Sequence, residues 1–254
     1  MALQRYLVLP DIHWPKHDPD ALACVLAVAR YFRPHETILL GDCLECDQFS
    51  SHQRKTLSED DSRSWMDDMQ SFAKAVLDPL AKASAKRVVM LEGNHEFRVE
   101  RAAVGSPAIR SVMDVISPRA LYGKRKRFLW VPYQEPVLGH YEITPSLWCV
   151  HGWSESEHAA TAHLSRCSSF SVIHGHTHRR QEDSKRDPAT NRVLLASSAG
   201  FLGTLQPVWR GADPTKWSHG FHTVYADPET DEYWITTHQI DRGSTLVHGK
   251  RIGA

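Results

Sequence analysis

Five short polar motifs follow one another along this chain, and each stands at or just past the end of a short apolar run. They read, in chain order, Asp11-Ile12-His13, Gly41-Asp42-Cys43-Leu44-Glu45, Gly93-Asn94-His95-Glu96, His151-Gly152 and Gly175-His176-Thr177-His178. Their side chains offer carboxylate, imidazole and amide oxygen, which are donors that suit divalent transition metals. One such motif is uninformative, but five in series predict a hydrolytic site that holds two metal ions.

The apolar runs before the first three motifs predict parallel strands joined by helices. Strands are expected at 5–10, 37–40 and 87–91, and each leads directly into a motif. A helix is expected at 18–32, where an acidic cap and a proline begin it, and another at 58–83, where apolar residues recur at helical spacing. This alternation predicts an α/β fold with its site at the carboxyl ends of the strands.

The later part of the chain is rich in predicted strands, which we expect to complete a second sheet. These strands are expected at 128–131, 147–150, 172–174, 193–196, 221–226 and 233–237. A turn-forming sequence at 227–231 joins the last two as a hairpin. No repeat, low-complexity tract or linker divides the chain, and 254 residues suit one α/β domain. We therefore predict a single domain over residues 1–254.

Charge, hydropathy and cysteine content narrow the class of protein. Thirty basic residues balance thirty acidic ones, so the whole chain has no electrostatic footprint for nucleic acid. No apolar stretch reaches membrane-spanning length, and residues 1–10 do not form the apolar region of a signal peptide. Five cysteines, an odd number in a chain of this size, favour reduced thiols. We therefore predict a cytoplasmic protein that does not associate with membranes.

The order of the motifs resembles the calcineurin-like metallophosphoesterase superfamily, whose pattern reads D-x-H, G-D-x-x, G-N-H-[DE], H, G-H-x-H. The resemblance runs from Asp11 to His178, about two thirds of the chain, and no core motif is missing. It implies a two-sheet α/β/β/α sandwich with the site at the carboxyl ends of the strands.

The resemblance also implies a role for each motif residue. The implied ligands are Asp11, His13 and His178 for one ion, Asn94, His151 and His176 for the other, and Asp42 as the bridge between them. His95 would act as a general acid or stabilise transition-state charge, and Glu96 would orient the His95 imidazole. The cofactors would be two divalent transition-metal ions; manganese is our expectation, and Fe, Zn, Co or Ni also suit these donors.

The implied reaction is the hydrolysis of a phosphoester. A hydroxide that bridges the metals would attack phosphorus in line, while His95 protonates the departing oxygen. A small phosphodiesterase is the favoured assignment, followed by a phosphomonoesterase and then a DNA nuclease. Protein phosphatases usually carry Gly-Asp-x-x-Asp-Arg-Gly, whereas the segment from Gly41 to Asp47 has no arginine. The large nucleases add a capping domain, for which little sequence remains.

An inactive, protein-binding member of this fold is the alternative from a different functional class. Such a scaffold is expected to lack ligands or the catalytic histidine, yet His95 and all seven implied ligands are present. The substrate is expected to be a phosphoester, with nucleotides and nucleic acids among the candidates. The oligomeric state is left open, a dimer included.

Several residues outside the ligand set are weaker candidates for substrate contact. Arg98 and Arg101 lie one helical turn apart after the third motif, and we expect Arg98 to be the one that faces the site. His17 follows the first motif in a loop, and Arg179 directly follows the last one. Each has an ordinary structural alternative, as a surface residue or a partner in a salt bridge.

Three further features allow both a structural and a functional interpretation. Cys43 and Cys46 form a C-x-x-C, for which a structural role is favoured over a redox pair or half of a zinc site. The basic run at 124–127 suits a solvated loop or a phosphate-rich partner. The aromatic loop at 201–221 suits a satellite hydrophobic cluster or a wall over the metal cleft.

Overall fold

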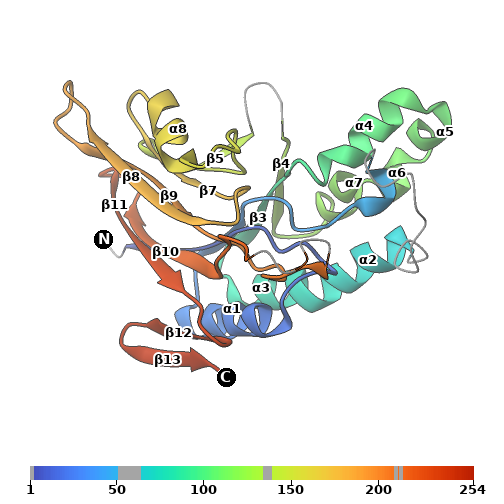
Figure 1. Ribbon diagram of the computed structural model, residues 1–254, viewed down its shortest axis with the longest axis horizontal. Helices are drawn as coiled ribbons and strands as arrows, with labels where there is room; N and C mark the ends of the chain where they lie inside the picture. The colour runs from blue at the N-terminus through green and yellow to red at the C-terminus, as the bar shows by residue number, and fades with distance from the viewer. Residues whose placement is uncertain (1–2, 51–63, 134–138, 209–210, 212–213) are drawn as a thin grey trace.

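Two sheets lie face to face with helices on both outer sides. The structure, a computed structural model, describes residues 3–50, 64–133, 139–208, 211 and 214–254. Figure 1 shows α1 (Pro19–Phe32) and α3 (Asp78–Ala83) below the sheets and α8 (Ala159–Arg166) above them. The α/β/β/α sandwich expected from the sequence is confirmed.

The first sheet has six strands, ordered β11-β10-β1-β2-β3-β4. Its four parallel strands are β1 (Gln4–Leu9), β2 (Glu36–Leu39), β3 (Arg87–Leu91) and β4 (Phe128–Val131). Two antiparallel strands, β10 (Gly220–Asp227) and β11 (Glu232–Gln239), extend it beyond β1. All six strands were predicted, including the hairpin of the last two.

The second sheet has five strands, ordered β5-β6-β7-β9-β8. The three central strands, all predicted from the sequence, are β6 (Leu147–Val150), β7 (Ser171–His174) and β9 (Val193–Ala199), and the structure shows that they run parallel. The antiparallel edge strands are β5 (His140–Thr144) and β8 (Arg180–Arg186). The sequence analysis found neither edge strand, and β8 has no apolar residue by which to find it.

Alternating side chains of β1 divide the apolar core into two layers. Tyr6 and Val8 point between the sheets, where they pack in one buried cluster with Leu147 and Ile173 of the second sheet. The intervening side chains, Leu7 among them, belong to a second cluster, between the six-stranded sheet and the helices α1 and α3. A third cluster joins α8 to the outer face of the second sheet. Both sheets are therefore covered by apolar contacts on both faces.

Two predicted helices line the outer face of the six-stranded sheet. α1 begins where Asp18 accepts hydrogen bonds from the backbone N–H groups of Asp20 and Ala21, at 3.1 and 2.9 Å. The other helix, expected at 58–83, is α2 (Trp65–Phe72) and α3, joined by a π-helical turn at Ala73–Leu77. Pro79 explains this turn, because its ring nitrogen cannot donate to the preceding turn of the helix. Positions 58–63 lie outside the described residues.

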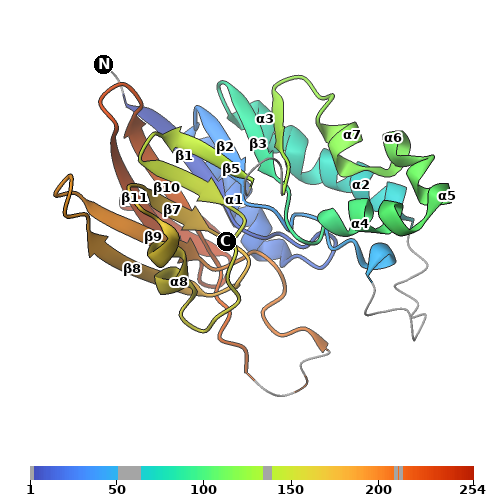
Figure 2. The same cartoon turned by 90° about the horizontal axis from the view of Figure 1, so that it is seen from above.

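Short helices and a terminal hairpin complete the described chain. One group of helices, α4 (Phe97–Gly105), α5 (Pro107–Arg110), α6 (Met113–Ile116) and α7 (Pro118–Tyr122), gathers at one end of the molecule (Figures 1 and 2). The hairpin of β12 (Ser244–Val247) and β13 (Lys250–Gly253) packs on α1, where the Cys24 thiol lies 3.7 Å from the Ile252 oxygen. Among the helices of the described ranges, none is both long and apolar enough to span a bilayer.

Candidate metal centre

The motif side chains come from both sheets and meet where the strands end. Asp11 and His13 follow β1, Asp42 follows β2, and Asn94 follows β3, all in the six-stranded sheet. The remaining predicted ligands are His151, His176 and His178, which follow β6 and β7 of the other sheet. The site is therefore assembled across the junction between the two sheets.

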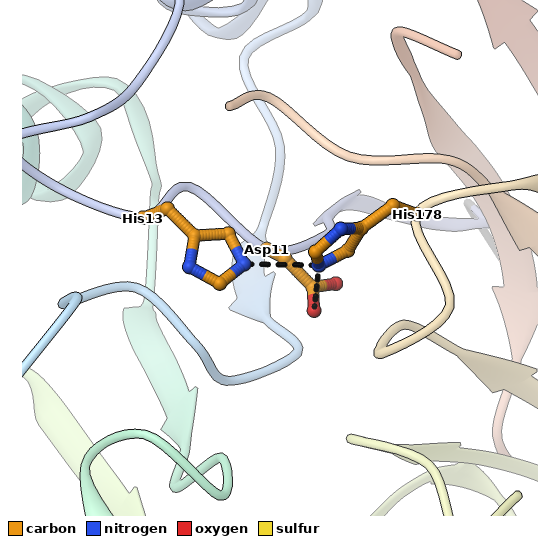
Figure 3. Close-up of side chains that lie close together, drawn as sticks. All are labelled: Asp11, His13 and His178. Atoms are coloured by element: carbon orange, nitrogen blue, oxygen red, sulfur yellow. Dashed lines mark hydrogen bonds and ion pairs between the residues drawn. The ribbon is translucent and has the colours of Figure 1, made fainter. Parts of the chain in front are cut away.

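Asp11, His13 and His178 form the first ligand group. Figure 3 shows both rings and the carboxylate directed toward one another. Nε2 of His13 lies 2.9 Å from Nε2 of His178, which lies 3.6 Å from Oδ1 of Asp11. These three residues are the set that the resemblance implies for one ion.

A second group gathers around the imidazole of His151. Its Nε2 lies 2.8 Å from Oδ1 of Asn94, 3.1 Å from Nδ1 of His176 and 3.5 Å from Oδ2 of Asp42. The structure thus also brings together the residues implied for the other ion. Asp42 lies with this second group. Its role as the bridge stays a prediction.

Both groups fit a divalent cation. Metal bonds of about 2.0–2.2 Å place tetrahedral ligand atoms roughly 3.3–3.6 Å apart, and the spacings above lie close to this range. Their donors are two carboxylates, four imidazoles and one amide oxygen, which suit borderline transition metals. The electrostatic field at His151 is negative. Although burial of the ring would lower the pKa of His151, the charge of Asp42 raises this pKa to about 9. A field that favours a proton on this ring also favours a metal cation.

Hydrogen bonds to the second ring nitrogen orient two of the imidazoles. Nδ1 of His151 donates to the Leu40 carbonyl at 2.9 Å, which leaves Nε2 directed into the second group. Nδ1 of His13 lies 2.7 Å from Oε2 of Glu45, which leaves the His13 Nε2 directed into the first group. Although burial opposes it, Glu45 raises the pKa of His13 to about 9. Sequence reasoning gave Glu45 no role, although it ends the second motif.

The backbone around the ligands takes up unusual conformations. Four of the predicted ligands have positive φ, namely His13 (56°), Asp42 (47°), His176 (71°) and His178 (58°). Non-glycine residues seldom adopt this region, and such strain concentrates at functional sites. The turns are also tight: a Cβ on Gly93 would lie 2.2 Å from Oδ1 of Asp42. The motif glycine is therefore required so that the backbone can approach the acid.

The role predicted for Glu96 needs correction. Its buried carboxylate accepts three backbone N–H groups, from Asp42 at 3.0 Å, Leu44 at 2.7 Å and Gly93 at 2.9 Å. It therefore fixes the second and third motif loops to each other instead of orienting the His95 imidazole. The physical reason is burial: a carboxylate with no access to water needs several donors, and the turns of these loops supply them.

His95 is oriented by Glu45 and Arg98 instead. Its Nδ1 donates to the Glu45 carbonyl at 2.9 Å, and its Nε2 accepts a hydrogen bond from the Arg98 guanidinium at 2.9 Å. Nε2 also lies 3.8 Å from Oδ2 of Asp42, so this nitrogen faces the second ligand group. Burial lowers the pKa of His95 to about 4, in keeping with a neutral ring that accepts at Nε2. Arg98 thus reaches the site, as the sequence analysis expected.

The other two substrate-contact candidates make contacts with residues outside the ligand groups. His17 stacks on Trp14, with ring centroids 4.4 Å apart and planes 9° from parallel. Arg179 donates to the Ser156 carbonyl at 2.9 Å. These contacts are structural, and substrate binding by either residue stays a prediction.

Aromatic residues of the 201–221 loop pack against the first ligand group. The Phe201 ring stacks on His178, with centroids 4.5 Å apart and planes 11° from parallel. Trp217 meets the same imidazole edge-on at 4.9 Å. In its described residues, the loop therefore forms a wall beside a predicted ligand; positions 209–210 and 212–213 lie outside the description. Sequence analysis left this interpretation open.

Neither the cysteine motif nor the basic run adds a second site. All five cysteines are unpaired and buried, and burial raises the pKa of Cys43 and Cys46 well above the usual range. Such thiols stay protonated and unreactive. In the basic run, Arg125 pairs with Asp78 and lies over the Phe128 ring at 5.4 Å. These contacts favour a structural role for the run.

A cavity of about 600 Å³ opens beside the second ligand group. Asn94 and His176 are among its lining residues, so a molecule bound there would reach candidate metal ligands. Its volume lies within the roughly 300–1,000 Å³ of pockets that enclose small molecules. The cavity therefore has room for a small molecule beside the second ligand group.

Comparisons with known proteins agree with this geometry. Residues 4–242 match the family described as calcineurin-like phosphoesterase. No curated protein matches the chain. One similar solved structure is vacuolar protein sorting 29 from Cryptosporidium parvum, with 12% identity, 100% of each chain covered and a TM-score of 0.48. Another is the phosphoesterase Yfce from E. coli, with 14% identity, 94% of this chain and 100% of that chain covered, and a TM-score of 0.38. The nuclease MPE of Pseudomonas putida is another (14% identity, 91% and 87% covered, TM-score 0.32). At these scores the likenesses carry no argument about function.

Proposed function

Because the chain belongs to the calcineurin-like phosphoesterase family, we propose that it is a metal-dependent phosphodiesterase that uses two divalent ions. The observation that supports this proposal is the adjacency of the two ligand groups to His95, whose Nε2 lies 3.8 Å from Asp42. Ions held by these groups would supply Lewis-acid chemistry, by polarising a phosphoryl oxygen and activating water. Manganese is the ion that we propose to test first.

His95 and Arg98 are proposed to act on the departing oxygen. The Arg98 guanidinium brings a fixed positive charge to Nε2 of His95, at 2.9 Å. Because burial lowers the pKa of His95 to about 4, the neutral ring prevails at pH 7. An anionic substrate that accepts the Arg98 hydrogen bond instead would free the Nε2 lone pair and raise that pKa, so that Nε2 could take a proton from water and pass it to the departing oxygen. Arg98 would meanwhile stabilise developing negative charge.

The cavity favours a diester over a monoester. A diester places a second organic group on phosphorus, and the space beside Asn94 and His176 accommodates such a group. A monoester carries an additional negative charge instead, which an arginine in the 41–47 segment would bind, and that segment has none. A phosphomonoesterase is therefore the second assignment.

Paired substrates test this proposal directly. Metal-stripped protein resupplied with Mn²⁺ would be assayed with bis-p-nitrophenyl phosphate and with p-nitrophenyl phosphate at equal concentrations. We expect faster hydrolysis of the diester and no hydrolysis before the metal is added. A preference for the monoester would replace the proposal with a phosphatase. If both esters stayed intact and the protein took up no metal, a non-catalytic binding protein would be the better assignment.

A further inference from the structure

The cavity beside the second ligand group has a marked division of charge between its walls. One wall is α4, which begins directly after the third motif and carries Arg98 and Arg101. The opposite wall is the loop after β6, with Trp153 and Glu155. Tyr133 also lines the cavity. A bound molecule would therefore meet cations on one side and aromatic rings nearby.

The two arginines lie on one face of α4 because they are three positions apart. Arg98 is held in place: it donates to His95 and, at 3.0 Å, to the Glu45 carbonyl, and it lies 3.8 Å from Asp47. Arg101 is exposed, and its guanidinium carbon lies 6.0 Å from the centre of the Phe97 ring. Within the described ranges no acid pairs with Arg101. Its charge is therefore free to bind an anion from solution.

The opposite wall limits where an anion can bind. Glu155 is largely exposed and its Oε1 lies 3.5 Å from Nε2 of His176, so negative charge already occupies that side. A second anion would be repelled there and attracted to α4. Tyr133 and Trp153 also line the cavity, so part of its surface is aromatic and suits a ligand that carries a planar ring. Together these features describe a ligand with a separate anionic group and a planar ring.

We propose that Arg101, next to Arg98, forms an anion subsite for a second phosphate of the substrate. The preferred substrate would then be a nucleotide-like phosphodiester that carries another phosphate beside the scissile one. This inference rests on the proposed phosphodiesterase function, which it deepens by naming a substrate class. The scissile phosphate would lie at the ligand groups, and the second phosphate would lie along α4.

Two chromogenic substrates that differ by one phosphate measure the contribution of the anion subsite to substrate binding. Both are p-nitrophenyl esters of thymidine 5′-phosphate, and one of them also carries a 3′-phosphate. With the Mn²⁺-loaded wild-type protein, we expect KM to be roughly tenfold lower for the bisphosphate, the effect of one charge-assisted hydrogen bond. In Arg101→Gln the ratio of the two KM values should fall to about 2 or less, and Arg101→Lys should be intermediate. Arg30→Gln, at an exposed position on α1, is the matched control and should keep the full ratio.

A binding measurement provides a readout that does not depend on turnover. Calorimetry should show tighter binding of thymidine 3′,5′-bisphosphate than of thymidine 5′-monophosphate to wild-type protein, and Arg101→Gln should lose this difference. Circular dichroism would establish that the variants fold. Equal KM values for the two esters in the wild type would overturn the subsite, as would a ratio unchanged in Arg101→Gln. Absence of hydrolysis of bis-p-nitrophenyl phosphate would instead refute the phosphodiesterase proposal itself.

Discussion

Glu45 holds His13 through a 2.7 Å contact between Oε2 and Nδ1, and its main-chain oxygen accepts a hydrogen bond from His95. One residue thus fixes a predicted metal ligand with its side chain and the predicted general acid with its backbone. A carboxylate behind a ligating imidazole makes that imidazole a stronger donor and sets its tautomer. Glu45 is therefore a positioning residue of the candidate site.

Replacement of Glu45 should weaken metal binding. Glu45→Gln keeps the shape but removes the charge behind His13, so we expect Mn²⁺ affinity to fall roughly 10- to 100-fold, the usual cost of losing such a partner. Titration calorimetry on metal-free protein would measure it. Glu229→Gln, an exposed glutamate in the β10–β11 turn, is the control and should bind as the wild type does. An unchanged Mn²⁺ affinity in Glu45→Gln would show that Glu45 does not position His13 for metal binding.

His95→Ala should separate metal binding from turnover. His95 lies beside the ligand groups without belonging to the implied ligand set, so both ions should still bind. Turnover should fall by roughly 10²–10⁴, the range for loss of a general acid. The loss should be smaller for a substrate with a good leaving group, whose oxygen needs less help from a proton. Full activity on a poor leaving group would show that His95 takes no part in the reaction.

Asp42→Asn tests the proposed bridge. If one carboxylate binds both ions, its conversion to an amide should weaken both, and metal analysis after gel filtration should find less than one ion per chain. Asn94→Ala is the comparison, because Asn94 is implied as a ligand of one ion only and its loss should spare the other. Loss of a single ion from Asp42→Asn would place Asp42 in one group alone.

The close approach of the second and third motif loops predicts a steric effect. A Cβ at Gly93 would lie 2.2 Å from both the backbone nitrogen and Oδ1 of Asp42, so Gly93→Ala must displace one of the loops. We expect a loss of about 1–3 kcal/mol in the free energy of unfolding, as for overpacked interiors. Gly105→Ala is the control, because a Cβ there has nothing within 4 Å. Urea denaturation of both variants measures the difference, and equal stabilities would contradict the predicted clash.

Buried neutral histidines predict a loss of stability in acid. Burial lowers the pKa of His222 to about 3, whereas the ring in the unfolded chain titrates near its ordinary value of 6.5. Between these values the unfolded state binds a proton that the folded state excludes. The free energy of unfolding should therefore fall as the pH drops from 6.5 toward 3, by roughly 1.4 kcal/mol per pH unit for this residue.

Urea denaturation at pH 7, 6, 5 and 4 would reveal this slope. His222→Gln should make it less steep by the contribution of this residue, because glutamine does not titrate and can still bond to Ser197, which lies 2.9 Å from the His222 ring. His158→Gln, at an exposed position before α8, should leave the slope as in the wild type. A slope that His222→Gln does not reduce would assign the acid sensitivity to other groups.

The sequence was most informative where apolar character and ligand chemistry coincide. Strands β1 and β3 each end in four apolar residues, and the motif residues follow directly, so both position and role could be predicted. The edge strand β8 could not, because Arg180–Arg186 is entirely polar and pairs with β9 through its backbone. Backbone pairing leaves no mark on side-chain periodicity.

Side-chain partners within the site were harder to predict than its ligands. The contact of Glu45 with His13 joins positions 32 apart, and that of Glu96 with the backbone of Asp42 joins positions 54 apart. Such contacts depend on how the loops fold over one another. The resemblance implies that Glu96 acts on its sequence neighbour His95, whereas its backbone partners in the second motif loop leave no signal in the sequence. Arg98, by contrast, contacts a residue one helical turn away, and helical spacing alone brought it to the site.

The candidate centre takes its ligands from the ends of two separate sheets, and this arrangement links metal binding to the cohesion of the fold. An ion held by Asp11 and His178 would join the ends of β1 and β7, just past the buried cluster that contains Val8 and Ile173. Binding energy would then add to the free energy that keeps the sheets together, in proportion to the logarithm of free metal concentration. Chelation should therefore lower the midpoint temperature of thermal unfolding. The concentration of free metal in a cell would then set how stably the two sheets are held together.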